Sequence, residues 1–323
     1  MNAHVVRAPS RRDRVRAATS QEIVATARRL LVEQGVTAVS LRAIAREMGM
    51  TAPALYRYYD SHEELLHHLV GDIFTELAGY LHTSIKAAER EFLAGGSSAP
   101  GDRAVSRGQA ISRGQAASGN VAPPGDLAPS GDLAPPGDLA PPGDLAPSGD
   151  LGAPGDLAPS GDLGASRGRP GDLVAVQLIA ACRAFRSWAL EHQPEFGMIF
   201  GSPLPGLDLM HDDPVAECGF RFGQVFLDLF SELWRRWPFR APADDEIDPS
   251  LRRQLAHYHD LVGADLPLGA LHTFLRCWVL LYGTVSLEVF GHLRFALDDA
   301  APLFELMLAD LAAMIGLEYP MPS

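Results

Sequence analysis

The chain has 323 residues, of which 47% are hydrophobic, so it has room for about two domains with a substantial core. Its formal net charge of −13 excludes a protein that binds polyanions over its whole surface. The charge is unevenly distributed, because residues 1–60 carry ten arginines against five acidic residues. We therefore expect only the N-terminal end to meet an anionic partner.

The three cysteines, Cys182, Cys218 and Cys277, are far apart and form no metal-type pair, which favours buried thiols in a reducing compartment. The first arginines are followed by polar residues rather than by the apolar run of a signal peptide. The charge-free apolar stretch at residues 277–287 is far shorter than the roughly 18–20 residues of a membrane span. The sequence thus predicts a cytoplasmic protein with no membrane partner.

A basic arm at residues 1–16, which we expect to be disordered, precedes the first predicted helix. That helix carries apolar residues at the spacing of one helical face and ends at Gly35. Further on, Ser61 and Glu64 have the Ser-x-x-Glu spacing of a capping box and start a long helix. The predicted N-terminal domain is residues 17–77, and residues 78–96 are the remainder of this long helix.

Two short helices joined by a turn, with the sequences "LRAIAREMGM" and "TAPALYRYY", lie between these segments. Ser40 and Thr51 are their predicted N-caps, and Pro53 fits the first turn of the second helix. This is the layout of a helix-turn-helix, whose second helix would present Tyr56 and Arg57 toward the DNA major groove. An ordinary helical hairpin whose tyrosines cover a core is the alternative that these residues alone leave open.

The stretch "LRAIAREMGMTAPALYRYYDSHEELL", with the preceding "LLVEQGVTAVS", closely resembles the DNA-binding domain of the TetR family of bacterial transcription regulators. The resemblance is continuous over about residues 17–73 and implies that the motif from Ser40 to Tyr59 binds operator DNA. The family usually has lysine at the position of His62, and a largely neutral imidazole weakens that phosphate contact. The resemblance implies backbone contacts from Ser40, Arg42, Thr51, Tyr56 and His62, and positions nearest the base edges for Thr51, Ala52, Pro53 and Leu55.

Residues 97–171 interrupt the helical pattern and hold 12 of the 25 prolines and 15 of the 31 glycines. Within them "GDLAPS", "GDLAPP" and close variants recur every six residues from 125 to 166. Proline at this density blocks helix, glycine raises the cost of ordering, and one leucine per repeat cannot offset that cost. We expect a disordered insertion. A β-helix solenoid is the alternative with such a short period, and the paired prolines argue against it.

Residues 172–323 are predicted to form a helical effector-binding and dimerisation domain, which makes the whole protein all-α. Helices are expected at 173–191, 215–237, 248–262, 268–290 and 298–315. The sequences "EHQPEFGMIFG" and "RCWVLLYGTVSLEVFGHL" resemble a TetR effector domain named for a Trp-His-Gly motif. Trp278 and Gly283 match that motif, and Tyr282 stands where the histidine belongs.

The aromatic-rich helix at 215–237 fits either a central core helix or the wall of an apolar ligand cavity. We expect Trp188, Phe222, Phe226 and Tyr258 in that wall and a small apolar effector. The last two helices carry surplus apolar stripes that indicate a partner, and the resemblance implies a homodimer that pairs them as a four-helix bundle. The residues expected at this interface are Phe274, Trp278, Leu281, Val285, Phe304, Met307, Leu311 and Met314.

His257 and His259 in "HYHD" are two positions apart on a helix and point to different faces, so we predict no metal site. No catalytic signature is evident, and neither enzyme activity nor a cofactor is expected. The predicted function is a ligand-responsive homodimeric repressor, released from its operator by an apolar small molecule. The alternatives are a constitutive DNA-binding or scaffold protein with a filled core and no effector, and an all-α metalloenzyme that keeps its metal after chelation.

Overall fold

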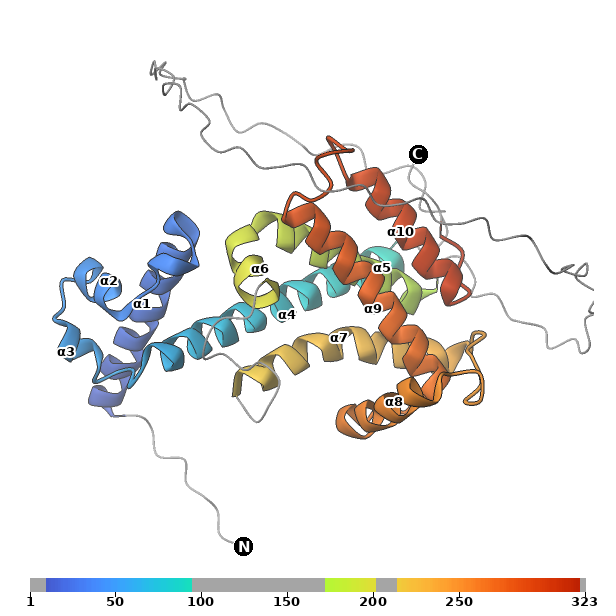
Figure 1. Ribbon diagram of the computed structural model, residues 1–323, viewed down its shortest axis with the longest axis horizontal. Coiled ribbons are helices and arrows are strands. Elements are labelled where there is room, and N and C mark those ends of the chain that lie inside the picture. Colours follow the sequence, from blue (N-terminus) through green and yellow to red (C-terminus); the bar gives the residue numbers. More distant parts are fainter. Residues whose placement is uncertain (1–9, 95–171, 202–213, 320–323) are drawn as a thin grey trace, which may run out of the picture. The chain divides into compact units, whose positions relative to one another are not determined.

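The computed structural model describes residues 10–94, 172–201 and 214–319, and every regular element in these ranges is a helix (Figure 1). The prediction of an all-α protein is confirmed. The predicted disordered insertion at residues 97–171 lies outside the described residues. The helices are α1 (Arg11–Gln34), the 3₁₀ helix η1 (Val36–Ala38), α2 (Leu41–Glu47), α3 (Ala52–Leu55), α4 (His62–Ala94), α5 (Leu173–Glu191), α6 (Gln193–Phe200), α7 (Pro214–Arg236), α8 (Pro249–Val262), α9 (Leu268–Val289) and α10 (Ala301–Met314).

Helix α1 begins inside the segment predicted to be a disordered arm, and that prediction is wrong for residues 11–16. The Ser10 hydroxyl accepts a hydrogen bond from the Asp13 N–H at 3.2 Å, and the Asp13 carboxylate accepts one from the Ser10 N–H at 3.0 Å. This reciprocal capping box satisfies two backbone donors and starts the helix ahead of the arginine run.

The other helix ends of the N-terminal part follow the sequence signals. The hydroxyls of Ser40 and Ser61 accept hydrogen bonds from the backbone N–H groups three residues on, at 3.2 and 3.0 Å, and so cap α2 and α4. Gly35 and Gly49 adopt positive φ angles of 84° and 64° after α1 and α2, a conformation that glycine adopts without steric cost. Thr51 stands at the N-cap position of α3, but its hydroxyl makes no capping bond.

Helix α4 connects the N-terminal helices with the C-terminal helical domain (Figure 1). Near its start it packs against α1, and further along it packs against α5 and α7. Buried residues recur along most of its length, from Leu65 to Ile85. One unbroken helix therefore belongs to both parts.

Phe185 on α5 is the centre of the C-terminal core. Its ring is fully buried and lies 5.9 Å from Phe196 of α6, 5.6 Å from Phe222 of α7 and 5.9 Å from Trp278 of α9, measured between centroids. Aromatic pairs at these separations add to the stabilisation that burial supplies. The cluster therefore holds four helices together through one side chain.

Two helices, α5 and α9, are long and apolar enough to cross a membrane by length and composition alone. In this fold α5 packs against α4 and α7, and α9 packs against α5, α8 and α10. A helix that is apolar on several sides is also typical of a protein core. Packing among helices of the same chain buries 44% of the apolar window of α5 and 39% of that of α9.

Candidate functional site

The three tyrosines that follow α3 divide between core and surface. Tyr59 is 2% exposed, and its hydroxyl lies 3.2 Å from Nδ1 of His68. Tyr58 is half-buried beneath the guanidinium of Arg16, which lies 5.8 Å from the ring centroid. Tyr56 is 51% exposed. Tyr56 is therefore the tyrosine that a partner can reach.

The remaining predicted DNA contacts lie on this surface, with one exception. Leu55 is fully buried in the core of the helix-turn-helix, so its predicted place near the base edges is wrong. In the described part of the chain neither Arg42 nor Arg57 pairs with a carboxylate, which leaves both cations available for phosphates. The exposed members of the set are Arg42, Thr51, Pro53, Tyr56 and Arg57, and the half-buried ones are Ser40, Ala52 and His62.

His62 is held by the helix-turn-helix itself. Its Nε2 lies 2.8 Å from the carbonyl oxygen of Val39, and because a carbonyl only accepts, Nε2 carries the proton and donates it. This bond joins the start of α4 to the segment before α2. A phosphate contact from His62 stays a prediction, and it requires a second proton, on Nδ1, because a phosphate oxygen only accepts.

The first turns of α1 are attached to the end of the tyrosine segment. Nη2 of Arg16 donates a hydrogen bond of 3.0 Å to the carbonyl oxygen of Arg57. Arg11, Arg12 and Arg14 precede it and are exposed. The basic surface of the N-terminal part thus includes α1, a contribution that the expectation of a disordered arm missed.

A cavity of about 50 Å³ lies among α5, α7, α9 and the end of α10. Its wall carries no charged side chain. Burial raises the pKa of the Cys182 thiol to about 12 and that of the Cys277 thiol to about 11, so both stay protonated and uncharged. Such a wall suits an apolar molecule. The lining residues are Leu178, Ile179, Cys182, Phe226, Phe230, Phe274, Cys277, Trp278, Leu281, Leu308, Leu311, Ala312, Ile315 and Leu317.

Of the four residues predicted for the cavity wall, Phe226 alone lines it. Phe222 is buried in the aromatic cluster around Phe185. Trp188 is fully buried and stacked on the ring of His192 at 4.8 Å. Tyr258 lines a separate, open groove on α8. The prediction is wrong for these three residues.

The residues predicted for the dimer interface belong to the core of the single chain. Phe274, Val285 and Phe304 are 7%, 0% and 1% exposed, and two of the set, Trp278 and Met314, are partly exposed. Four of the eight, Phe274, Trp278, Leu281 and Leu311, line the cavity. The interface prediction is therefore wrong for the six buried residues, and for Trp278 and Met314 it stays a prediction. The opposite faces of α9 and α10 expose Val279, Leu280, Leu287, Leu303 and Leu306.

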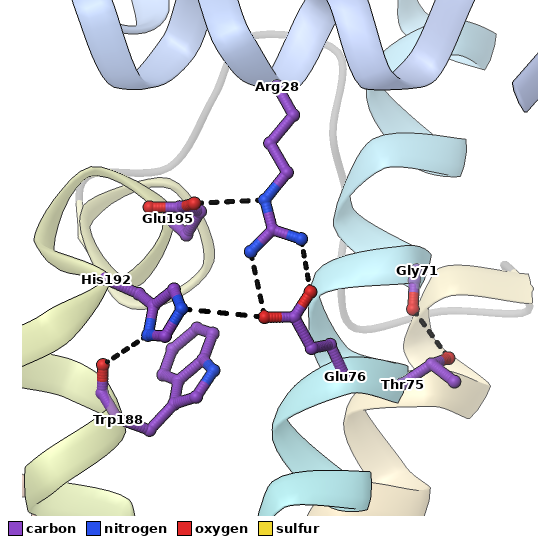
Figure 2. A network of polar contacts seen from close by, with 7 residues as sticks. All are labelled: Arg28, Gly71, Thr75, Glu76, Trp188, His192 and Glu195. Atoms are coloured by element: carbon purple, nitrogen blue, oxygen red, sulfur yellow. Dashed lines mark hydrogen bonds and ion pairs between the residues drawn. The ribbon is translucent and has the colours of Figure 1, made fainter. Parts of the chain in front are cut away.

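Arg28 on α1 meets acidic residues from two other helices (Figure 2). Its Nε donates to Glu195 of α6 at 3.0 Å, and its Nη2 donates to Glu76 of α4 at 2.9 Å, with a second bond from Nη1 to Glu76. Glu195 is only 4% exposed. The hydrogen bond from Arg28 lowers the pKa of Glu76, and the bond to Glu76 raises the pKa of Arg28. Both groups therefore stay charged near neutral pH.

His192 extends this network toward α5 (Figure 2). Its Nε2 lies 3.7 Å from Glu76, and its Nδ1 donates to the Trp188 carbonyl oxygen at 3.0 Å. The polar network therefore connects α1 of the helix-turn-helix with α4, α5 and α6. Sequence patterns gave no sign of it, because Arg28 and Glu195 are 167 positions apart.

Two family models match the chain, one in each folded part. Residues 23–69 match the model described as "Bacterial regulatory proteins, tetR family", and residues 178–311 match "Tetracyclin repressor-like, C-terminal domain". Together the matched ranges include more than half of the chain. The Trp-His-Gly subtype stays a prediction, because the C-terminal match does not name it.

The chain is similar to "HTH-type transcriptional regulator Mb1846" of Mycobacterium bovis and to "HTH-type transcriptional regulator Rv1816" of Mycobacterium tuberculosis. Each is 44% identical over 72 residues, which is 22% of this chain and 30% of the relative. The alignment thus spans less than a third of these relatives. A crystal structure described as "putative regulatory protein SCO4313" shares the fold, with a TM-score of 0.54 and 23% identity, covering 94% of this chain and 100% of that one. With both folded parts matched, the chain belongs to the TetR family of bacterial transcription regulators.

Proposed function

We propose that the protein is a homodimeric repressor in the cytoplasm that leaves its operator when a small apolar molecule binds the C-terminal domain. The single observation that carries this proposal is a physical connection within one chain. An exposed basic helix-turn-helix surface is joined, through Arg28 and Glu195, to a domain that contains an apolar cavity. The role is regulatory rather than catalytic.

DNA binding is assigned to the exposed face around Tyr56 and Arg42. Tyr56 is 51% exposed and brings a hydroxyl that can donate to a phosphate oxygen, and exposed Arg42 offers an unpaired cation. Tyr56→Ala is expected to weaken operator binding by about 1–3 kcal/mol, the range for a lost hydrogen bond to a charged group. Arg42→Gln should also reduce the salt dependence of binding by about 0.9 in the slope of log K against log salt.

The measurement begins with an operator selected from random or genomic DNA and continues with titrations at several salt concentrations. Tyr56→Phe keeps the ring and removes the hydroxyl, so it should show most of the loss seen with Tyr56→Ala. Arg90→Gln, an exposed arginine on α4, is the charge-matched control and should leave the salt slope unchanged. Full-strength binding by both Tyr56→Ala and Arg42→Ala would reject the assignment.

Dimerisation is assigned to the outward faces of α9 and α10. Val279 is 65% exposed and Leu306 is 51% exposed, large fractions for apolar side chains on well-formed helices. A Cβ atom added at Gly283, on the same face of α9 as Val279, would meet no atom of this chain within 4 Å. That leaves room for close approach of a second copy. Two-fold pairing would place the helix-turn-helix motifs of the two protomers about 34 Å apart or a multiple of that.

The cavity supports an effector that is small, neutral and apolar. Its volume of about 50 Å³ is smaller than the roughly 150 Å³ of a cavity that accepts benzene. An effector of that size or larger must therefore displace the surrounding helices, which is how binding could act on the rest of the molecule.

A short series of contacts leads from the cavity to α1 of the DNA-binding domain. Trp278 lines the cavity and contacts Phe185, and Phe185 contacts Phe196 on α6. The residue before Phe196 is Glu195, which holds Arg28 of α1. Movement of α9 or α5 around a ligand would shift α6 and with it the orientation of α1. Linkage requires that such an effector bind less tightly to the DNA complex.

The effector proposal is tested by a thermal-shift screen of neutral apolar compounds, followed by operator titration with each hit. A coupling of about 1–3 kcal/mol, typical of allosteric proteins, would weaken operator binding 5- to 150-fold. Ala312→Leu adds volume inside the cavity and should keep operator binding while losing the response. Compounds that stabilise the protein without changing operator affinity would favour the constitutive DNA-binding alternative.

A further inference from the structure

We propose that the segment at residues 315–319, directly after α10, is the entrance of the cavity, and that Arg183, Glu305 and Tyr319 form a latch that keeps it shut. Twelve of the fourteen residues that line the cavity lie on α5, α7, α9 or α10. The other two, Ile315 and Leu317, follow the last residue of α10. One part of the wall is therefore a short turn rather than a packed helix.

The turn is directed inward by its backbone. Gly316 adopts φ +71°, a left-handed conformation that is rarely open to other residues. The N–H of Leu317 then donates to the carbonyl oxygen of Ala312 at 2.8 Å. Ile315 and Leu317 are 5% and 8% exposed. This geometry places both side chains over the cavity as a cover.

The outer end of the turn is held by side chains from two helices. Arg183 of α5 donates to Glu305 of α10 through Nε at 3.1 Å and Nη2 at 2.8 Å. Tyr319 donates its hydroxyl to Glu305 and accepts a hydrogen bond from Arg183, whose guanidinium carbon lies 5.7 Å from the ring centroid. Burial raises the pKa of the Tyr319 hydroxyl, which therefore remains a donor. The three residues form the latch.

The latch is the weakest part of the wall. The Arg183 side chain is 47% exposed and that of Glu305 is 20% exposed, so water screens this ion pair and limits its strength. Separating α5, α7, α9 and α10 would instead expose fully buried aromatic and aliphatic side chains. Release of Tyr319 is thus the least costly way to open the cavity. The inference uses the proposed function only to say what enters.

The test uses one cysteine of the cavity as the reporter of opening. Cys182 lines the cavity and is 6% exposed, so a thiol reagent should reach it when the wall opens. Cys277 also lines the cavity but is partly exposed, and it is therefore removed. The probe is 4,4′-dithiodipyridine, a neutral aromatic disulfide. A protein thiolate attacks one of its sulfur atoms, forms a mixed disulfide and releases 4-thiopyridone, whose absorbance gives the rate. The Cys218→Ser/Cys277→Ser background leaves Cys182 as the only thiol of the protein, and Cys218 lies beside Gly71 and outside the cavity.

In this background Tyr319→Phe is expected to raise the labelling rate of Cys182 about tenfold, because one hydrogen bond to a charged group is lost. Glu305→Gln should raise it as well. Tyr258→Phe removes a tyrosine hydroxyl on α8, away from the latch, and should label at the parent rate. Urea unfolding of each variant separates local opening from a change in global stability.

An unchanged rate in Tyr319→Phe would overturn the proposal. So would a rate increase no larger than the variant's loss of global stability predicts. The measurement involves neither DNA nor an effector. A negative effector screen would therefore contradict the proposed function and leave the latch result standing.

Discussion

Arg28→Met is expected to lower the free energy of unfolding by about 3–5 kcal/mol, the range for removing one partner of a buried ion pair. The size follows from Glu195, which is 4% exposed and would keep its charge in the interior without a cation. Glu76 contributes less to the loss, since its side chain is 40% exposed and water can hydrate it. Urea denaturation at pH 7 measures the difference.

Arg29→Met is the matched control for this substitution. Arg29 is the next residue on α1, is 47% exposed and pairs with Glu33 and Glu47, also at the surface. Exposed pairs of this kind contribute about 0–1 kcal/mol each, so the control should cost far less than Arg28→Met. Equal losses from the two substitutions would show that the buried network does not stabilise the fold.

The loss of unfolding free energy in Arg28→Met should shrink as the pH falls below 4.5, the unfolded pKa of Glu76. In the wild type Arg28 lowers the folded-state pKa of Glu76. Glu76 therefore contributes stability that is present above its unfolded value of 4.5 and is lost as the pH falls through the lowered pKa. In the variant that contribution is absent, so the difference in unfolding free energy between wild type and variant narrows below pH 4.5.

The double variant Arg28→Met/Glu195→Leu separates stability from signalling. Replacing a buried ion pair by apolar residues is often close to neutral, so most of the lost stability should return. If the network carries the effector signal, this variant will bind operator and effector and yet show little coupling between them. If a stable double variant still releases its operator when effector binds, the network does not carry the signal and α4 alone must carry it.

Val279→Glu combined with Leu306→Glu should convert the protein to a monomer at micromolar concentration. In a two-fold interface each substitution occurs twice, so four unpaired charges would be buried on association. A cost of about 3–5 kcal/mol raises the dissociation constant roughly hundred- to thousandfold, and more if the sites add. Sedimentation velocity gives the mass, and affinity for a palindromic operator should fall with it.

Both residues are exposed in the single chain, so the helical content and unfolding of the protomer should change little. Leu261→Glu is the control, because Leu261 is 67% exposed on α8, away from the outward faces of α9 and α10. It should leave the oligomeric state unchanged. A wild-type monomer at micromolar concentration, or a dimer that survives both charges, would exclude these faces as the interface.

The sequence by itself determined most of the helices and the family. The signals for Ser40, Ser61 and Gly35 act within one or two turns of the chain, and all three residues start or end helices as predicted. The predicted helix at 173–191 coincides with α5. Capping bonds and backbone conformation are local, so they do not depend on what packs against the helix.

The tertiary structure alone decided which apolar face of a helix is buried. Trp278 and Val279 are neighbours on α9, yet Trp278 lines the cavity whereas Val279 is 65% exposed. Periodicity finds an apolar stripe only when the opposite face is polar, and both faces of α9 and α10 are apolar. The interface prediction therefore chose the residues that pack inside the protomer. Leu55 was misplaced for a related reason, since a four-residue helix has too few positions to define a buried side.

The ion pair that connects the helix-turn-helix with the C-terminal domain could not be predicted from the sequence either. Arg28 and Glu195 each resemble an ordinary surface charge, because an isolated charged residue in a helical pattern is normally solvated. They become a buried pair only when α6 packs against α1, across a separation of 167 positions. Local patterns specify each helix, whereas the burial of a charge depends on the helices that enclose it.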